Sequence, residues 1–280
     1  MPTTELDAAG EILTRIELDP TYLTRLAWGS RMWSGQERMY AAMHDHDRLI
    51  VTGGHSVGKT YGGAWFVCEF VATHPGAKVV IVGPTFGQVK TRLWADVRKA
   101  YHTSRVPLGG EMKAEEWIIE DGWYARIAGA DRPESLQGVH GNNVLVLVDE
   151  ASGVNARLWP ALDSLMASEG AKMIVWCNPT EPDGRTRDMA DDPRWKHMVL
   201  SCLDHPNVIE GREVIPGAVT KAWVDDKREQ LRRGLIDQDY WRARVCGEFA
   251  TGGENAVVTR SDLEAAADGT RDVADAKRIG

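Results

Sequence analysis

The chain is short of the features that mark membrane and secreted proteins. None of its apolar stretches approaches the roughly 20 residues that a membrane-spanning helix requires. Residues 1–7 lack the basic and then apolar segments of a secretion signal. The four cysteines are scattered along the 280 residues, without the short spacings of a metal site. We therefore expect a cytoplasmic protein with reduced, mostly buried thiols and no membrane contact.

Basic residues are in the minority as well. There are 33 lysines and arginines against 41 aspartates and glutamates, so the formal net charge is -8. This balance gives no overall basic surface for nucleic acid, although it does not exclude such a partner. Any contact with DNA must be local, or shared with another domain or subunit. The hydrophobic fraction of 43% is ample for a packed core.

The most informative segment is glycine-rich and spans residues 53–60. It reads Gly-Gly-His-Ser-Val-Gly-Lys-Thr and fits the phosphate-loop pattern G-x-x-x-x-G-K-[ST] in full. Residues 48–52 before it are typical of a short buried strand, and residues 61–71 after it of a helix. In that context backbone N–H groups and the helix N-terminus can hold phosphate oxygens. A chance glycine-rich turn is the alternative, and it does not explain the flanking strand and helix.

This pattern assigns roles to individual side chains. Lys59 would reach the β- and γ-phosphates of a nucleotide, and the Thr60 hydroxyl would ligate Mg²⁺. The residues expected to bind nucleotide here are Gly53, Gly54, His55, Ser56, Val57, Gly58, Lys59, Thr60 and Tyr61.

A second part of the expected site follows an apolar run at residues 143–148. The run suits a parallel strand buried on both faces, and it ends in Asp149 and Glu150. Ligands of open α/β sheets bind at this carboxyl edge. Asp149 there can hold Mg²⁺, and Glu150 can orient and polarise the attacking water. The alternative is an acidic pair that merely caps a strand.

The remaining pattern indicates an α/β fold with a mainly parallel sheet. Further strands are expected at residues 78–85, 172–176 and 197–200, with a helix from Gln88 to Tyr101 and a hairpin over 117–127 on an Asp-Gly turn. Residues 155–168 read as a helix interrupted near Pro160. The composition of the chain then changes, because residues 220–234 and 237–244 are predicted to form charged helices. We expect a core over 1–203, a small helical lid over 204–250 and a linker over 251–280.

In order along the chain, these motifs resemble the ATPase domain of tailed-phage terminase large subunits, which package DNA into capsids. The likeness covers roughly residues 20–250, and its ordered set is more specific than the two phosphate-site motifs alone. The matching pieces are Trp33-Ser34-Gly35-Gln36, the phosphate loop, Gly83-Pro84-Thr85 with Gln88, Ser135 to Gly141, Val144 to Glu150, Cys177 to Thr180 and Gly247-Glu248-Phe249.

The resemblance implies a P-loop NTPase of the additional-strand class, with a catalytic glutamate beside the Walker B aspartate. ATP and Mg²⁺ are the expected ligands. Gln36 and Trp33 would recognise adenine, with a helix cap beside a core tryptophan as the alternative. Asn178 would sense the γ-phosphate and couple it to motion, although a plain strand-terminating turn is also possible. The resemblance therefore implies catalytic roles for Glu150, Lys59 and Asn178.

An arginine is still needed, because the phosphate loop contains none to balance charge on the transferring phosphate. Arg132 is our first candidate, supplied in cis or by a neighbouring subunit, with Arg126 and Arg105 as alternatives. Arg132 could equally pair with a nearby acidic residue on the surface.

The resemblance also implies partners: double-stranded DNA, a portal ring, the small terminase subunit and further copies of the chain in a ring. The family's large subunit carries a nuclease built on clustered aspartates, and the sequence stops where its first strand would begin. We expect no nuclease activity from this chain, because its tail carboxylates lack a supporting sheet.

Two other functions compete with the packaging ATPase. A helicase-like or RecA-like repair ATPase would need a second lobe, for which too few residues remain. A nucleotide or small-molecule kinase would need a lid, whose arginines could be Arg185, Arg187, Arg232 and Arg233. The Asp149-Glu150 pair and Asn178 favour activation of water over transfer to an alcohol.

Overall fold

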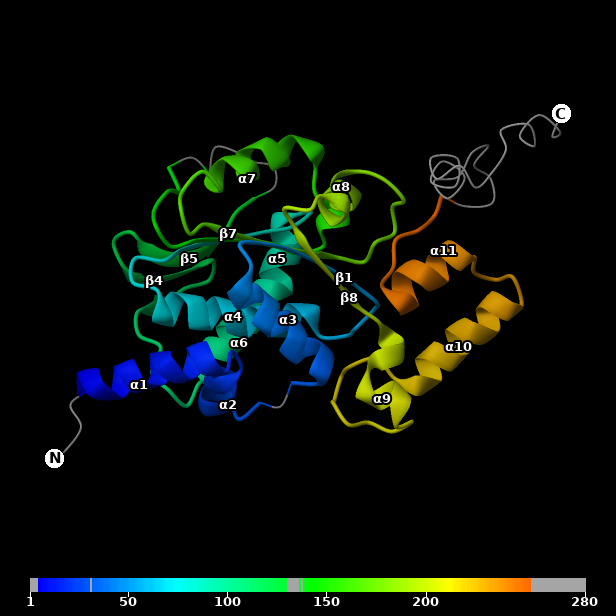
Figure 1. Ribbon diagram of the computed structural model, residues 1–280, viewed down its shortest axis with the longest axis horizontal. Coiled ribbons are helices and arrows are strands. Elements are labelled where there is room, and N and C mark those ends of the chain that lie inside the picture. Colours follow the sequence, from blue (N-terminus) through cyan, green and yellow to red (C-terminus); the bar gives the residue numbers. More distant parts are fainter. Residues whose placement is uncertain (1–4, 31, 130–135, 137, 253–280) are drawn as a thin grey trace.

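A computed structural model describes residues 5–30, 32–129, 136 and 138–252 of the chain. Its centre is an eight-stranded sheet in the order β3-β4-β5-β2-β6-β7-β1-β8 (Figure 1). From β5 to β8 in this order neighbouring strands run parallel, whereas β3, β4 and β5 pair antiparallel. The strands are β1 (Arg48–Gly53), β2 (Lys78–Val82), β3 (Glu111–Met112), β4 (Glu116–Glu120), β5 (Trp123–Ile127), β6 (Val144–Val148), β7 (Lys172–Cys177) and β8 (Lys196–Leu200).

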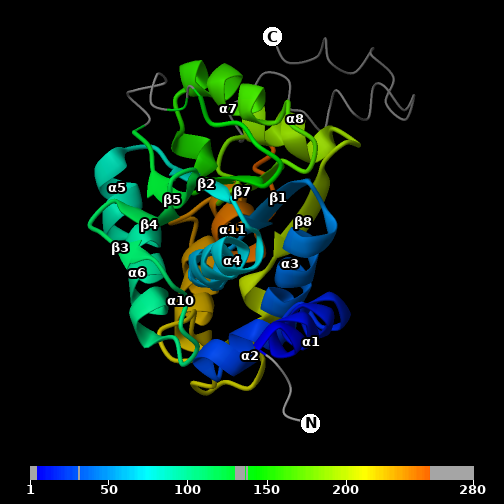
Figure 2. The ribbon, with the colours of Figure 1, turned by 90° about the vertical axis from the view of Figure 1, so that its left-hand side faces the viewer.

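Helices cover both faces of the sheet. Figure 2 shows α7 and α8 on one side of it and α3, α4 and α6 on the other. The helices are α1 (Glu5–Leu18), α2 (Tyr22–Trp28), α3 (Ser34–Asp45), α4 (Lys59–Thr73), α5 (Phe86–Thr91), α6 (Leu93–Thr103), α7 (Trp159–Leu165), α8 (Arg185–Asp191), α9 (Pro206–Ile209), α10 (Lys221–Arg232) and α11 (Gln238–Trp241).

Two apolar cores follow from the period-two geometry of the strands. In β6, Leu145 and Leu147 join the core under α3, α4 and α6, whereas Val144, Val146 and Val148 join the core under α7 and α8. Successive side chains of a strand point to opposite faces, so a strand between two helical layers must be apolar throughout. The unbroken apolar run that predicted this strand therefore has its physical reason in the layered fold.

The order of the central strands decides the class of the fold. β7 pairs with β6 on one side and with β1 on the other, so it lies between the strand of the phosphate loop and the strand of Asp149. This inserted strand is the feature expected of the additional-strand P-loop class, and the predicted α/β class is confirmed. The parallel arrangement also brings the carboxyl ends of β1, β7 and β6 to one edge.

Several sequence expectations about elements need adjustment. The hairpin over 117–127 is confirmed as β4 and β5. The single helix expected from Gln88 to Tyr101 was wrong, because the chain breaks at Arg92 (φ -110°, ψ -92°) into α5 and α6. Pro160 does not interrupt a helix but lies in the first turn of α7, where its missing N–H costs nothing. All four cysteines are free thiols, and three of them are buried.

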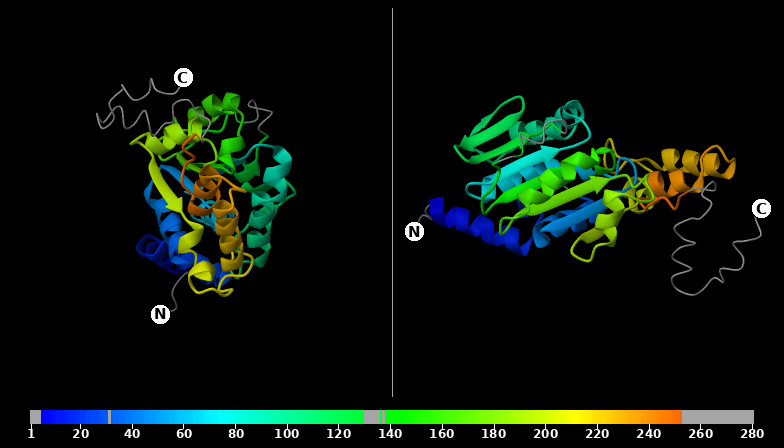
Figure 3. Two further views of the ribbon diagram at one scale, coloured as in Figure 1. Left: turned by 90° about the vertical axis from the view of Figure 1, so that its right-hand side faces the viewer. Right: turned by 90° about the horizontal axis from the view of Figure 1, so that it is seen from above.

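The segment from α9 to α11 stands at one end of the molecule, and α1 at the other (Figure 3). After α11 the chain forms a π-helical turn at Arg242–Cys246, whose end lies against β1 and the phosphate loop. We call residues 204–250 the lid. In the described part of the chain, no helix is both long and apolar enough to cross a membrane.

Candidate functional site

The phosphate loop joins the end of β1 to the start of α4. Its backbone leaves regular geometry twice, at Ser56 (φ 54°) and at Gly58 (φ 89°). Only glycine suits position 58 well, since a Cβ there would lie 2.4 Å from the Gln36 Nε2 atom. The loop opens onto the N-terminus of a 15-residue helix, whose free N–H groups favour an anion. This segment thus has the backbone geometry that a phosphate-binding loop requires.

Lys59 begins α4 with its ammonium group folded back onto the loop. Its Nζ donates hydrogen bonds to the carbonyl oxygens of Gly53 (3.1 Å) and Gly54 (2.9 Å). Burial lowers the pKa of Lys59 to about 8. Phosphate oxygens are stronger acceptors than carbonyl groups, so an anion in the loop can draw the ammonium away from them.

Asp149 follows β6 and is almost fully buried, with 6% of its surface exposed. Its Oδ1 atom accepts hydrogen bonds from the Trp176 indole and from the Glu150 backbone N–H. Burial raises the pKa of the Asp149 carboxyl to about 6. Both hydrogen bonds reach the same oxygen, and no other described group bonds to Oδ2. The second oxygen is therefore available to a cation or its water.

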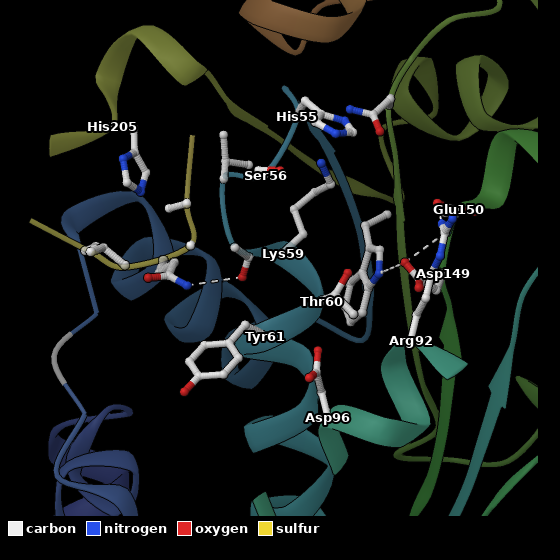
Figure 4. Close-up of a pocket in the computed structure, with 18 of the residues that line it drawn as sticks. His55, Ser56, Lys59, Thr60, Tyr61, Arg92, Asp96, Asp149, Glu150 and His205 are labelled. Atoms are coloured by element: carbon white, nitrogen blue, oxygen red, sulfur yellow. Dashed lines mark hydrogen bonds and ion pairs between the residues drawn. The ribbon is translucent and has the colours of Figure 1, made fainter. Parts of the chain in front are cut away.

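Glu150 takes an unusual backbone conformation, with φ 49° and ψ 44°. Its carboxylate forms an ion pair with the Arg92 guanidinium, and both side chains are partly exposed in the same pocket. Figure 4 shows Arg92 reaching toward Glu150 beside Asp149. Sequence reasoning missed Arg92. Its position depends on the break between α5 and α6, for which the sequence gives no signal.

Asn178 comes directly after β7 and connects both halves of the site. Its Nδ2 atom donates a 2.6 Å hydrogen bond to the Gly53 carbonyl, and its own carbonyl accepts one from Ser152 Oγ (3.1 Å). The next residue, Pro179, accepts a hydrogen bond from the Ala250 N–H at the end of the lid. The predicted coupling residue therefore lies between the phosphate loop, the turn after Glu150 and the lid.

Trp33 and Gln36 also lie against the phosphate loop. The Trp33 indole donates to the Val57 carbonyl (3.1 Å), and Gln36 Nε2 donates to the Gly58 carbonyl (3.1 Å). Gln36 Oε1 additionally accepts from the Trp33 backbone N–H. The amide keeps one N–H and one lone pair free, which is the pair that an adenine edge requires. Both the capping role and adenine recognition are compatible with this geometry.

The lid forms a second contact surface for the phosphate loop, which sequence reasoning did not predict. His55 donates its backbone N–H to the Arg244 carbonyl (2.8 Å), and Ser56 accepts from the Val219 N–H (3.1 Å). The His55 ring stacks on Trp223 of α10 with ring centroids 5.9 Å apart. The non-glycine residues at the tip of the loop are thus held between core and lid.

Together these residues surround a pocket of about 740 Å³, within the size range of small-molecule sites. It brings together most of the predicted residues and adds Arg92, Asp96, His205 and the segment 215–218. Among the predicted arginines, Arg132 lies outside the described residues, and Arg126 stacks on Tyr124. Arg185, Arg187, Arg232 and Arg233, the arginines suggested for a kinase, do not line this pocket.

The fold and this site define a P-loop NTPase of the additional-strand class. The family model described as terminase large subunit, T4likevirus-type, N-terminal, matches residues 50–264. The chain therefore belongs to the terminase large subunit family.

Individual relatives agree with this. A protein of Enterobacteria phage P7 called a probable terminase large subunit is 24% identical over 251 residues, covering 84% of this chain and 49% of that protein. The chain thus spans about half the length of this relative.

Solved structures with a similar fold include large terminases. That of bacteriophage HK97 has a TM-score of 0.63 at 14% identity, over 89% of this chain and 58% of that one. The ATPase domain of the Thermus phage P74-26 large terminase has a TM-score of 0.53 at 15% identity, over 80% and 96%. The large terminase of a thermophilic bacteriophage in complex with ATP-gamma-S has a TM-score of 0.58 at 16% identity, over 79% and 54%.

Proposed function

We propose that this chain hydrolyses ATP with Mg²⁺ and that the hydrolysis drives double-stranded viral DNA into a procapsid. One observation carries the proposal: the phosphate loop, a buried aspartate and a glutamate meet at the carboxyl ends of β1, β7 and β6. Family membership supports the packaging role. The ATP-gamma-S complex of the large terminase from the thermophilic bacteriophage supports ATP as the nucleotide.

The side chains at the edge of the sheet suit Mg²⁺. Asp149 Oδ2 and the Thr60 hydroxyl are hard oxygen donors, and Mg²⁺ prefers such ligands together with water and phosphate oxygens. The ion would neutralise charge on the β- and γ-phosphates. The two hydrogen bonds to Oδ1 fix the Asp149 carboxylate, so that its other oxygen is presented without reorganisation.

The remaining chemistry is positioning and electrostatics. Lys59 exchanges its two carbonyl acceptors for phosphate oxygens, and Glu150 orients the attacking water and receives its proton. Arg92 stands at the Glu150 carboxylate and adds a positive charge on that side of the pocket. Arg92 is therefore a cis candidate for balancing phosphate charge, beside Arg132 as a candidate from a neighbouring copy.

Hydrogen bonds to the phosphate loop also suggest which residues couple hydrolysis to motion and which recognise the base. We assign coupling to Asn178, because its amide holds the phosphate loop and the residue after it bonds to the end of the lid. We assign adenine recognition to Gln36, with Trp33 fixing its position. The lid over 204–250 would respond to the nucleotide, and 251–280 would lead from the 1–203 core toward a nuclease domain.

The partners of such a motor are double-stranded DNA, a portal ring, a small terminase subunit and further copies of the chain. A helicase-like or RecA-like repair ATPase is the alternative. Stimulation of ATP turnover by a portal ring distinguishes them, because a repair ATPase has no reason to respond to it. No nuclease activity is proposed for residues 1–280.

Two substitutions test the chemistry. Lys59→Ala should weaken nucleotide binding and abolish turnover, because it removes the positive charge that would contact the phosphates. Glu150→Gln should bind ATP with near-normal affinity and hydrolyse it at least about 100-fold more slowly. Phosphate release and nucleotide affinity are measured with and without Mg²⁺. A Glu150→Gln chain with the wild-type rate removes Glu150 from the mechanism.

A further inference from the structure

His205 is a nearly enclosed polar side chain in the wall of the nucleotide pocket. It lies between β8 and α9, and only 1% of its surface is exposed. Its ring meets Trp33 edge-on, with centroids 5.1 Å apart. In Figure 4 the phosphate-loop side chains Ser56 and Lys59 lie between His205 and Glu150. The side chain therefore stands away from the end of the pocket where hydrolysis would occur.

The hydrogen bonds of this ring fix the position of its proton. Nδ1 accepts the backbone N–H of Asn207 at 3.3 Å, so the neutral ring must carry its proton on Nε2. Burial lowers the pKa of His205, so the ring stays neutral near pH 7. No described residue accepts a hydrogen bond from Nε2. The ring lines the nucleotide pocket, so this N–H can donate a hydrogen bond to a ligand bound there.

The surrounding contacts hold this donor in place. Asn207 Nδ2 donates to the Ile215 carbonyl, and Asn207 Oδ1 accepts the backbone N–H groups of Val214 and Ile215, each at 2.8 Å. Residues 215–218 then form the neighbouring wall of the pocket. Through Trp33, the His205 ring is also linked to Gln36, whose amide has one donor and one acceptor left. Gln36 and His205 thus line the same pocket and both contact Trp33.

We propose that His205 selects the nucleobase by donating its Nε2–H to N1 of adenine. The proposal rests on ATP hydrolysis as the function. With the phosphates in the loop and the γ-phosphate toward Glu150, the base extends toward Gln36 and His205. N3 and N7 accept hydrogen bonds in both purines, whereas N1 accepts in adenine and carries a hydrogen in guanine. With guanine, the N1–H of the base would meet the Nε2–H of His205, and neither donor would have an acceptor. A polar site discriminates against an analogue in this way.

A matched pair of variants separates the two nitrogen atoms of the ring. In His205→Asn the Oδ1 atom can still accept the Asn207 N–H as a helix cap, but the Nε2 donor is lost. In His205→Gln an amide N–H can reach the Nε2 position, while the cap is lost. Affinities for ADP and GDP are measured by calorimetry on the full chain with Mg²⁺. We expect the preference for ADP over GDP to fall about tenfold in His205→Asn and to be largely kept in His205→Gln.

A base analogue gives a second test that needs no variant. 1-Deaza-ADP has carbon in place of N1, so wild-type protein should bind it about tenfold more weakly than ADP. Equal affinity for the two, or an unchanged ADP preference in His205→Asn, overturns the role of His205. If either result is found while the wild-type chain hydrolyses ATP, only the role of His205 falls and the proposed function stands. Failure of the wild-type chain to bind ADP at all defeats both.

Discussion

Glu150 and Arg92, at the end of the pocket where we propose hydrolysis, are held in backbone conformations that regular structure avoids. Glu150 has φ 49°, and Arg92 interrupts what would be one continuous helix. Left-handed backbone at a non-glycine residue costs about 1 kcal/mol or more and persists only where neighbours enforce it. Together the two conformations let the side chains meet as an ion pair. This local geometry, rather than residue type alone, makes Arg92 a functional candidate.

Removing the Arg92 charge should separate catalysis from binding. We expect Arg92→Ala to lower ATP turnover at least about 100-fold, because the phosphate loses balancing charge and Glu150 loses its partner. Affinity for ADP should change less than about threefold, since ADP lacks the γ-phosphate. Arg98→Ala is the matched control, because Arg98 lies exposed on α6, the helix that follows Arg92, and outside the pocket. Equal turnover in both variants would contradict the role of Arg92.

At the scale of elements, the phosphate loop is packed between β8 and the last turn of the lid. Gly247 ends that turn with φ 75°, and a Cβ there would lie 2.8 Å from Gly53 Cα and 2.9 Å from the Gly54 nitrogen. The Gly54 N–H itself donates to the Leu200 carbonyl. From this close approach of three backbones we expect the loop and the end of the lid to move together.

Two glycines of the lid test this contact. Gly234 has φ 67° and open space around it, so Gly234→Ala should cost only the strain of left-handed backbone, about 1–2 kcal/mol. Gly247→Ala should cost more in urea denaturation and should also weaken ADP binding at least about tenfold, because the added methyl group displaces the phosphate loop. If the two variants lose the same stability and bind ADP equally, loop and lid are not tightly coupled.

At the scale of the whole molecule, we expect three histidines that are buried in part or in full to make the stability depend on pH. Burial lowers the pKa of His74, His197 and His205 below the ordinary value. As the pH falls through about 6.5, the unfolded chain takes up these protons first, so the free energy of unfolding decreases. We expect a lower urea midpoint at about pH 6 than at about pH 7.5.

A single substitution checks this expectation. His74→Gln removes one of the three groups, so the difference between the two midpoints should shrink. Asp149, with its pKa raised to about 6, acts in the opposite direction, which confines the test to pH 6 and above. A midpoint that stays constant or rises as the pH is lowered across this range would contradict the prediction.

Assembly is the second property of the whole molecule. If Arg132 completes the site of a neighbouring copy, the chain alone should be weakly active, and its specific activity should rise with concentration or on a portal ring. Mixing Arg132→Ala with Glu150→Gln chains should restore part of the activity, since one interface then has both intact groups. Full activity of a proven monomer, without such rescue, would rule out this trans role.

The sequence by itself determined the class of the protein. Two local patterns carry this information: the phosphate loop and the apolar run before Asp149, each with its flanking elements. Neighbouring residues alone determine the backbone freedom of the loop, the period of the strand and the start of the helix. For the same reason the sequence predicted Lys59, Asp149 and Glu150 as site residues, and the structure places all three around one pocket. The ordered motifs pointed to the family that the comparison confirms. The charged helices after residue 204 were equally visible, because their composition changes.

Only the tertiary structure decided which distant residues share the site. Arg92 meets Glu150 across 58 positions, and the contacts of His55 with Trp223 and Arg244 span more still. Nothing local in the sequence marks the helix break that places Arg92 in the pocket, or shows that His205 lines the same pocket. Such pairs depend on how strands are ordered and how helices pack over them, and in that packing many weak contacts act together.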